Sequence, residues 1–252
     1  MSGSVLITGA SSGFGQACAR KFAANNRNVI IAARRQERIA RLQEELSEQT
    51  GVYAVTLDVR DREAVFELAT NLPDEFSDVE ILINNAGLAL GLEGADAADM
   101  DDWETMVDTN VKGVMYCTRA FLPAMVARGS GHVVNVGSVA GTWPYPGGNV
   151  YGGTKAFVQQ FSRNLRSDLL GKNIRVSDVE PGMCQTEFST VRFCGDEEKA
   201  KRVYAGMQPL TSEDVAEIIY WVTALPAHIN INQLEVMPTA QAWAPFAVHR
   251  EE

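Results

Sequence analysis

The sequence has 252 residues, of which 46% are hydrophobic and 21% charged, and its formal net charge at pH 7 is −10. This length fits one α/β domain with a large core, and the acidic charge argues against binding to the phosphate backbone of nucleic acid. The sequence has no run of about 18 apolar residues, so no membrane-spanning helix is predicted. We therefore expect a single domain over residues 1–252 with neither a nucleic-acid nor a membrane partner.

The N-terminal segment and the cysteines indicate a cytoplasmic protein. Residues 1–4 lead directly into an apolar run and carry no basic region, so no signal peptide is expected. The four cysteines are Cys18, Cys117, Cys184 and Cys194. Their spacing is that of neither a metal site nor a redox pair. Reduced thiols in a cytoplasm are the simplest interpretation, and no bound metal is predicted.

Apolar runs alternate with amphipathic stretches along the whole chain. Strands are predicted at Val5–Thr8, Asn28–Ala33, Tyr53–Asp58, Ile81–Asn84, His132–Ser138, Arg175–Glu180 and Gln233–Met237. Helices are predicted at Phe14–Ala24, Gln36–Gln49, Arg62–Leu72, Trp103–Ala127, Tyr151–Leu170 and Glu213–Ala224. Asp61 or Ser212 is expected to cap the helix that follows it. Strands that alternate with helices predict an α/β fold of the Rossmann type, a doubly wound parallel sheet of about seven strands in a single domain.

Candidate functional residues gather at the carboxyl ends of the predicted strands. The first six strands are ended or followed by Gly9, Arg34, Asp58, Asn84, Ser138 and Pro181. In sheets of this kind ligands lie beyond the carboxyl ends of the strands. We therefore expect one site, built from six segments of the chain, at that edge of the sheet.

A glycine-rich segment follows the first strand. It consists of Thr8, Gly9, Ala10, Ser11, Ser12, Gly13, Phe14 and Gly15. Glycines in this place let backbone N–H groups approach a pyrophosphate at a helix N-terminus. A plain strand–turn–helix connection is the alternative, but the position at the first strand of a βαβ pattern favours nucleotide binding.

The end of the second strand indicates which dinucleotide binds. In NAD-binding units an acidic residue about 20 residues after the glycine loop accepts the ribose hydroxyls, whereas NADP requires a cation for its 2′-phosphate. Here Ala33 is followed by Arg34 and Arg35, with no acid at the strand end. These arginines, together with Ser11 or Ser12, favour NADPH/NADP+ as the cofactor. The alternative is two arginines that open a surface helix.

Two further segments are assigned to the cofactor. Asp58 is followed by Val59, and its carboxylate is placed to accept from the adenine amino group or, alternatively, to serve a helix cap or turn. The fourth strand is closed by Asn84, Asn85, Ala86 and Gly87. This segment suits a tight turn against the cofactor, and an asparagine-rich turn without a function is the alternative.

Four residues form the candidate catalytic set. Tyr151 and Lys155 lie four apart on a predicted helix, so an ammonium beside the phenol is expected to lower the tyrosine pKa below roughly 10 and allow proton exchange with an alcohol. Ser138 is placed to donate to a carbonyl oxygen. Asn110, on or beside an apolar helix stripe, is expected to cap backbone or to hold a water in a proton relay. A Ser-His-Asp hydrolase is disfavoured because Ser138 lies in no Gly-x-Ser-x-Gly elbow.

Together these residues resemble the short-chain dehydrogenase/reductases of the NADP-preferring branch. The resemblance extends over essentially the whole chain, through Thr8-Gly-x-x-x-Gly13-x-Gly15, Asp58, Asn84–Gly87, Asn110, Ser138, Tyr151-x-x-x-Lys155, Pro181-Gly182 and Thr186. It implies that Tyr151 is the general acid/base, that Lys155 also binds the nicotinamide ribose, and that Ser138 polarises the substrate carbonyl while Asn110 positions a relay water. It also implies contacts to the nicotinamide end of the cofactor from Pro181, Gly182, Met183 and Thr186, with hydride passing to or from the carbonyl carbon.

Several segments are similar to a bacterial subgroup that holds the 3-hydroxy acid dehydrogenases and sulfoacetaldehyde reductase. They are residues 85–91, 102–110, 143–151 and 226–232, while 180–188 and 241–243 are nearer to sulfoacetaldehyde reductase. The resemblance implies reduction of a small anionic aldehyde by NADPH, and sulfoacetaldehyde to isethionate is the leading interpretation. An NADP-dependent 3-hydroxy acid dehydrogenase acting on malonic semialdehyde, 3-hydroxypropionate or serine is the alternative. A catalytically silent NADP-binding sensor is a distant one.

Residues after the sixth strand are candidates for a substrate pocket. The segment near 183–210 lies where this fold places a lid, and Arg192 within it is suited to hold a carboxylate or sulfonate through paired hydrogen bonds. Trp143, Tyr145 and Phe188 are expected to wall the pocket. The alternatives are a loop ion pair for Arg192 and plain loop packing for Trp143 and Tyr145.

The resemblance also implies a homotetramer. The predicted helices 103–127 and 151–170 expose long apolar faces, and such helices pair across subunits in this family. The C-terminal tail Trp243–Glu252 carries Phe246, His249 and Arg250. We expect this tail to reach the pocket of a neighbouring subunit.

Overall fold

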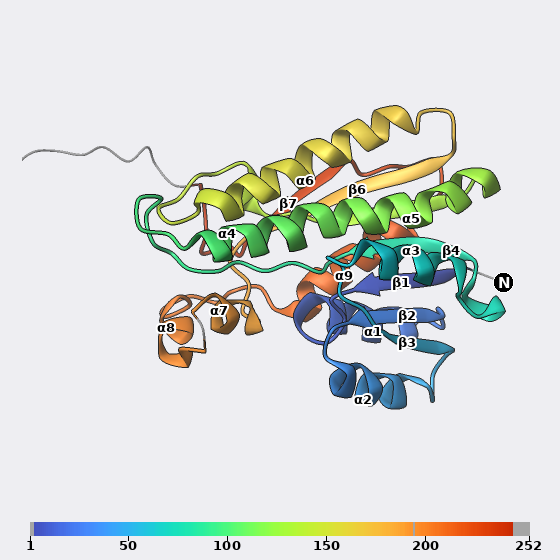
Figure 1. The fold of residues 1–252 in the computed structure, drawn as a ribbon, viewed down its shortest axis with the longest axis horizontal. Helices are drawn as coiled ribbons and strands as arrows, with labels where there is room; N and C mark the ends of the chain where they lie inside the picture. Colours follow the sequence, from blue (N-terminus) through green and yellow to red (C-terminus); the bar gives the residue numbers. More distant parts are fainter. Residues whose placement is uncertain (1–2, 194, 244–252) are drawn as a thin grey trace, which may run out of the picture.

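Parallel strands form the centre of the protein (Figure 1). The structure is a computed structural model that describes residues 3–193 and 195–243. Within these residues seven strands pair in the order β3-β2-β1-β4-β5-β6-β7. They are β1 Ser4–Thr8, β2 Val29–Ala33, β3 Val52–Thr56, β4 Val79–Asn84, β5 Gly131–Val136, β6 Ile174–Pro181 and β7 Gln233–Val236. The order reverses between β1 and β4, so the predicted doubly wound α/β fold of the Rossmann type is confirmed.

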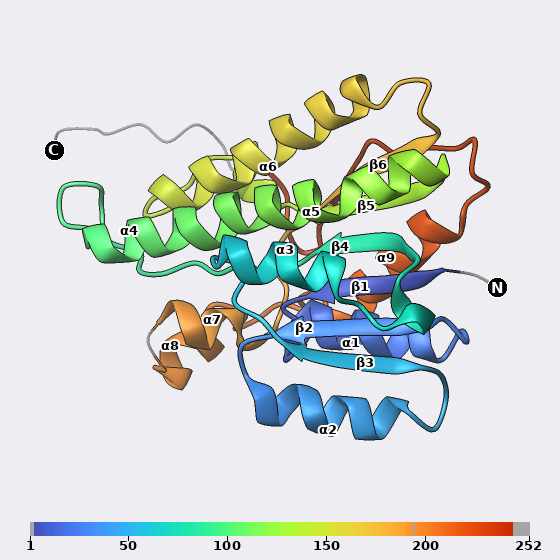
Figure 2. The ribbon, with the colours of Figure 1, turned by 45° about the vertical axis from the view of Figure 1, so that its right-hand side comes forward.

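Helices cover both faces of this sheet (Figures 1 and 2). One layer contains α1 (Gly13–Ala23), α2 (Gln36–Leu46) and α9 (Ser212–Ala224), and the other contains α3 (Arg62–Thr70), α5 (Gly113–Arg128) and α6 (Asn149–Asp168). Side chains alternate along a strand, so Val5 and Ile7 pack into the first layer and Leu6 into the second. No described helix combines the length and the apolar character needed to span a bilayer.

The predicted helix Trp103–Ala127 is wrong in one respect, because the structure divides it. α4 (Met100–Val107) and α5 are joined by a π-helical turn over Asp108–Lys112. Asn110 lies in that turn, where its Oδ1 accepts from the Leu88 backbone N–H at 2.9 Å and its Nδ2 donates to the Leu88 carbonyl at 2.8 Å. The wider turn accommodates this contact with the segment after β4, which apolar periodicity alone does not predict.

The other predicted elements are present, with ends that differ by a few residues. The expected cap Asp61 is confirmed, since its Oδ1 accepts from the Ala64 N–H at 3.0 Å. Ser212 is not a cap, because Thr211 and Asp214 form a reciprocal capping box at the start of α9. The unpredicted elements are 3-10 turns at Asp74–Phe76 and Val139–Gly141 and the short helices α7 (Glu187–Arg192) and α8 (Glu197–Arg202).

The segment after β6 carries α7 and α8 and lies beyond the carboxyl ends of the strands (Figure 1). We call residues 183–193 and 195–210 the lid segment. An isolated bridge between Cys184 and Leu210 brings its two ends together. The Tyr204 hydroxyl donates to the Cys184 carbonyl at 2.7 Å and lies 2.6 Å from the Ser189 hydroxyl. These contacts within the lid segment hold it together independently of its contacts with the rest of the protein.

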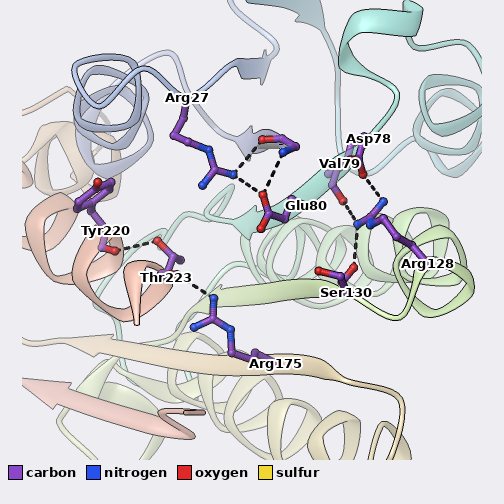
Figure 3. Close-up of polar contacts among 10 residues, drawn as sticks. Arg27, Asp78, Val79, Glu80, Arg128, Ser130, Arg175, Tyr220 and Thr223 are labelled. Atoms are coloured by element: carbon purple, nitrogen blue, oxygen red, sulfur yellow. Dashed lines mark hydrogen bonds and ion pairs between the residues drawn. The ribbon is translucent and has the colours of Figure 1, made fainter. Parts of the chain in front are cut away.

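Arginines join segments at the opposite, amino-terminal edge of the sheet (Figure 3). Arg175 of β6 donates to three carbonyl groups at the end of α9, those of Val222, Thr223 and Leu225, at 3.3, 2.8 and 3.2 Å. Arg27 and Arg128 make comparable links to Gly3, Asp78, Val79, Glu80 and Ser130. A cation at the C-terminal end of a helix complements its dipole. These contacts fix the edge of the sheet that faces away from the site.

Candidate active site

A cavity of about 270 Å³ opens at the carboxyl edge of the sheet. Most of the predicted cofactor residues line it, namely Gly9, Ser11, Ser12, Gly13, Phe14, Arg34, Arg35, Asp58, Val59, Asn85, Ala86, Gly87, Lys155 and Thr186. Its walls come from segments after β1, β2, β3, β4 and β6. Because doubly wound sheets bind their ligands where the strand order reverses, this cavity is the candidate cofactor site.

The glycine loop between β1 and α1 packs tightly against the segment after β4. A Cβ atom on Gly15 would lie 2.5 Å from both the Asn85 Nδ2 atom and the Gly9 carbonyl oxygen. Gly9 has a φ of 67°, which glycine adopts without strain. Thr8 accepts from the Asn85 and Ala86 N–H groups at 3.0 Å each. Thr8 and Gly15 thus support the loop without lining the cavity, and the N-terminus of α1 faces it as pyrophosphate binding requires.

The cationic side of the cavity fits a 2′-phosphate. Arg34 and Arg35 both line it. Arg35 Nε donates to Ser11 Oγ at 3.0 Å, and a terminal nitrogen donates to Ser12 Oγ at 2.6 Å. The same guanidinium donates to Glu187 of α7 at 3.0 Å. The predicted arginine and serine groups are therefore together, and a carboxylate from the lid segment lies among them.

Asp58 also lines the cavity, in an ionised state. Arg60 donates to both oxygens of its carboxylate at distances of 2.6 to 3.0 Å. These hydrogen bonds lower the pKa of Asp58 below its usual value, although partial burial acts in the other direction. The Arg60 backbone N–H donates to the same carboxylate at 3.0 Å. Asp58 thus has the turn contact foreseen as its alternative, and a contact with adenine stays a prediction.

Tyr151 and Lys155 lie one turn apart on α6 with buried side chains. Lys155 Nζ lies 5.9 Å from the centroid of the Tyr151 ring and donates to the Val136 carbonyl at 2.7 Å. The prediction of a lowered tyrosine pKa is wrong for this structure. Burial raises the pKa of Tyr151 to about 12, and hydrogen bonding with Ser138 and the charge of Arg192 offset this only in part. Burial lowers the pKa of Lys155 to about 8, so a neutral phenol lies beside an ammonium at neutral pH.

Ser138 and Asn110 complete the predicted catalytic set. Ser138 begins the 3-10 turn after β5, where its hydroxyl oxygen accepts from the Ala140 N–H at 3.1 Å. Asn110 is 1% exposed and also donates to the Thr154 hydroxyl at 3.1 Å. A Cβ atom on Gly87 would lie 3.2 Å from Asn110 Oδ1 and 3.6 Å from Lys155 Nζ. Asn110 therefore caps backbone close to Lys155, and its role in a water relay stays a prediction.

The residues after β6 differ in how they relate to the cavity. The Gly182 N–H donates to the Val236 carbonyl at 2.7 Å. Met183 donates to the Gln241 side chain at 2.7 Å and accepts from the Leu210 N–H at 3.0 Å. Pro181, Gly182 and Met183 do not line the cavity. Thr186 does, and its hydroxyl oxygen caps α7 by accepting from the Phe188 N–H at 3.1 Å.

The lid segment brings Arg192 and Phe188 to Tyr151. The Phe188 and Tyr151 ring centroids are 5.6 Å apart. The Arg192 guanidinium carbon lies 5.6 Å from the Tyr151 centroid, and its nitrogens donate to the Tyr145 hydroxyl at 2.8 Å and to the Gly91 carbonyl at 3.1 Å. A cation and two aromatic rings therefore surround the candidate proton donor. Among the described residues, no three His, Cys, Asp or Glu side chains converge as metal ligands.

Trp143 contacts β7 and the C-terminal segment. Its indole N–H donates to Glu235 of β7 at 2.6 Å, and its ring centroid is 5.7 Å from that of Trp243. Trp243 donates to the other oxygen of Glu235 at 2.9 Å. Trp143 thus has the packing role given as its alternative, and a place in the wall of the substrate pocket stays a prediction. The predicted tail beyond Trp243 lies outside the described residues.

Comparison with known proteins identifies the family. Residues 4–194 match the family model described as short chain dehydrogenase. The chain belongs to the short-chain dehydrogenases. It is 55% identical over 247 residues to an NADP-dependent 3-hydroxy acid dehydrogenase, YdfG, of Salmonella typhi, which covers 98% of this chain and 99% of that one.

Two further matches show how closely related proteins differ in substrate. Sulfoacetaldehyde reductase 2 of Chromohalobacter salexigens is 53% identical to this short-chain dehydrogenase over 252 residues, covering 100% of both chains. The solved structure of the closed form of serine dehydrogenase complexed with NADP+ has a TM-score of 0.96 and 54% identity, covering 98% of this chain and 99% of that one. The resemblance that the motifs indicated is confirmed at the level of the family.

The cavity of this short-chain dehydrogenase also contains residues that sequence reasoning missed. They are Ala33, Leu57, Leu88, Thr109, Val136, Glu187 and Val191. Ala33 and Val136 lie at or near the ends of predicted strands, and Thr109 is next to Asn110. These positions could have indicated that the three residues lie at the site. Nothing in the sequence indicated Glu187, because an acidic side chain is not expected at a phosphate-binding site.

Proposed function

We propose that this short-chain dehydrogenase, an NADP-dependent oxidoreductase acting on CH–OH groups, interconverts a short 3-hydroxy acid and its semialdehyde. Malonic semialdehyde with 3-hydroxypropionate, and serine, are the proposed substrates. The supporting observation is Arg192, whose guanidinium lies 5.6 Å from the Tyr151 ring. A fixed cation beside the proton donor suits a substrate that carries an anion close to its carbonyl. The similarity to 3-hydroxy acid and serine dehydrogenases supports these substrates over sulfoacetaldehyde.

The proposed chemistry divides the substrate among three side chains. Arg192 holds the carboxylate through paired, charge-assisted hydrogen bonds. Ser138 donates to the carbonyl oxygen as negative charge develops there. Tyr151, kept protonated by its raised pKa of about 12, then delivers a proton to that oxygen. The charge of Lys155 stabilises the resulting phenolate.

The cofactor side of the proposal depends on the cavity. The nicotinamide of NADP(H), when bound, supplies or accepts the hydride. Arg34 and Arg35, with the hydroxyls of Ser11 and Ser12, are the groups proposed to receive its 2′-phosphate, and the glycine loop its pyrophosphate. Glycine at position 15 is consistent with this assignment, because a larger side chain would displace Asn85 and the loop.

Reduction of sulfoacetaldehyde to isethionate is the second candidate. Its sulfonate, like the carboxylate of malonic semialdehyde, is one methylene from the aldehyde, so Arg192 is equally suited to bind it. Residues 180–188 resemble sulfoacetaldehyde reductase, and a protein of that name aligns over the whole chain. Both substrates therefore enter the same test.

The deciding experiment compares kcat/KM for malonic semialdehyde and sulfoacetaldehyde with NADPH. We expect the larger value for malonic semialdehyde, and a larger value for sulfoacetaldehyde would make the second candidate the function. Tyr151→Phe should lower kcat by about 10²- to 10⁴-fold, the contribution typical of a general acid. Turnover that survives this change would contradict the proton role, and no turnover of any small aldehyde by the unaltered protein would favour the NADP-binding sensor.

A second arm tests Arg192. We expect Arg192→Met to raise KM for both anionic aldehydes by about tenfold or more, since a charge-assisted contact is lost. Propionaldehyde, which has no anion, is the matched control and should keep its KM. An equal effect on all three aldehydes would mean that Arg192 only supports the lid segment.

Assembly and location complete the proposal. We expect a homotetramer in which α4, α5 and α6 pair across subunits. The exposure of Met100, Val107 and Met115 on α4 and α5 supports such an interface. A cytoplasmic location agrees with the buried free thiols of Cys18, Cys117 and Cys184. Sedimentation of the purified protein tests the assembly, and a mass other than that of four chains would contradict it.

A further inference from the structure

Glu187 links the lid segment to the cationic side of the cavity. It is the first residue of α7 and lines the cavity together with Arg35. Its carboxylate accepts from Arg35 at 3.0 Å and from Arg38 of α2 at 2.7 and 2.9 Å. These contacts join residues about 150 positions apart in the sequence. One carboxylate therefore ties the lid segment to the junction of β2 and α2.

Arg35 has a second set of partners, which lie in the glycine loop. Two of its nitrogens donate to Ser11 and Ser12, and the third donates to Glu187. A phosphate at this place requires the same donors, since Arg35 and the two serines are the groups assigned to it. Among the described residues, no carboxylate lies within ion-pair distance of Arg34. Of the two arginines assigned to the 2′-phosphate, Glu187 thus pairs with Arg35 and leaves Arg34 to an incoming anion.

The remaining contacts of the lid segment do not depend on Glu187. Phe188 packs on Tyr151, and Arg192 donates to Tyr145 and Gly91. Thr186 caps α7 through its own hydroxyl. The substrate side of α7 is therefore held separately from its cofactor side. A change at Glu187 affects the cofactor side first.

We propose that Glu187 competes with the 2′-phosphate of NADP for Arg35, so that binding of a 2′-phosphorylated nucleotide displaces the Glu187 carboxylate from Arg35 and leaves it paired with Arg38 of α2. This inference rests on the proposed placement of the 2′-phosphate, and it adds a residue that sets how strongly the protein discriminates NADP from NAD. The Arg35 and Glu187 side chains are 42% and 46% exposed. Ion pairs this exposed are weak, which suits a contact that opens and closes during each binding event.

The test measures dissociation constants of NADP+ and NAD+ by isothermal titration calorimetry. The quantity compared is the ratio of the NAD+ constant to the NADP+ constant, because a general loosening of the lid segment changes both constants alike. We expect Glu187→Gln to raise this ratio about threefold or more, as loss of a weak competing ion pair allows. Glu187→Ala should change it in the same direction.

The matched control is Glu198→Gln. Glu198 also lies in the lid segment, on α8, but it pairs with Lys201. This variant removes the same charge and should leave the ratio unchanged. A ratio that falls or stays the same in Glu187→Gln, or that rises equally in Glu198→Gln, would overturn the inference. An unaltered protein that binds NAD+ as tightly as NADP+ would instead overturn the cofactor assignment, and the competition with it.

Discussion

The protonation state of Lys155 determines the charge beside Tyr151. Its ammonium is buried beside Tyr151, and burial lowers its pKa to about 8 while the charge of Asp178 opposes this. Asp178 is itself buried, and burial together with the neighbouring Glu180 raises its pKa. Glu180 accepts from the Gln159 and Gln233 side chains at 2.9 Å each. The pKa of Lys155 is thus set by burial first and by the charge of Asp178 second, and Asp178 does not line the cavity.

We expect reduction by NADPH to weaken as the pH rises through about 8. The ammonium of Lys155 is present below this pH and lost above it, whereas Tyr151, with a pKa of about 12, stays protonated over the same range. Above the break, kcat/KM should fall by about tenfold per pH unit, as for a single deprotonation. A profile of kcat/KM between roughly pH 6 and 10 measures this.

Asp178→Asn provides the control for that assignment. It removes a carboxylate that favours the ammonium when ionised, so the break should move to a lower pH. Asp108→Asn is the matched comparison, because Asp108 pairs with Lys112 on the exposed side of the π-helical turn. A break that stays in place or moves upward in Asp178→Asn would show that a group other than Lys155 titrates.

At the scale of elements, α9 depends on a side chain from the sheet. Its last carbonyl groups receive three hydrogen bonds from Arg175, and Leu225, which ends the helix, has an extended backbone. Four carbonyl groups at a helix end lack partners within the helix. Arg175 supplies those partners here, in place of the glycine that ends many helices.

We expect Arg175→Met to lower the free energy of unfolding by about 2–3 kcal/mol, because methionine keeps an apolar stem but leaves these carbonyl groups unbonded. Urea denaturation measures the change. Arg163→Met is the matched control, since Arg163 is exposed and donates to Gln233 alone among the described residues. Equal losses in the two variants would mean that the bonds to α9 contribute nothing beyond those of a surface arginine.

The elements that the sequence predicts are those whose signal is local. Near-continuous β-branched or aliphatic runs identify the early strands. Asp61 is a cap because its partner is three residues away. The π-helical turn at Asn110 depends on Leu88, 22 residues earlier. α7 and α8 are short helices with little apolar periodicity. Such features arise from contacts between distant segments, which composition and spacing do not report.

The same distinction holds for the site. The glycine loop, Ser138, Tyr151 and Lys155 are recognisable from spacing and strand ends, and the cavity brings the loop and Lys155 together. The pKa of Tyr151 is not predictable from its neighbour alone, because burial outweighs the nearby charges. Glu187 is unpredictable for a different reason. Its partners Arg35 and Arg38 are brought to it only by the packing of the lid segment on α2.

At the scale of the whole molecule, the C-terminal segment crosses from β7 to the edge of the site. Gln241 accepts from the Met183 N–H of the lid segment at 2.7 Å. Trp243 donates to Glu235 and packs on Trp143, in the loop that also carries Tyr145. Gln241 and Trp243 therefore lie beside the lid segment and the loop of Tyr145, two segments that are proposed to bind substrate.

We expect deletion of the residues after Gln241 to raise KM for the anionic aldehyde by about three- to tenfold while kcat changes less, because one charged contact is lost. A chain that ends at Trp243 is the matched control, since it keeps the contact with Glu235 and lacks residues 244–252, which carry Phe246, His249 and Arg250. Equal increases in the two truncated proteins, each with an unaltered mass in sedimentation, would place the effect in the tail. Unchanged KM values in both would exclude the tail from the site.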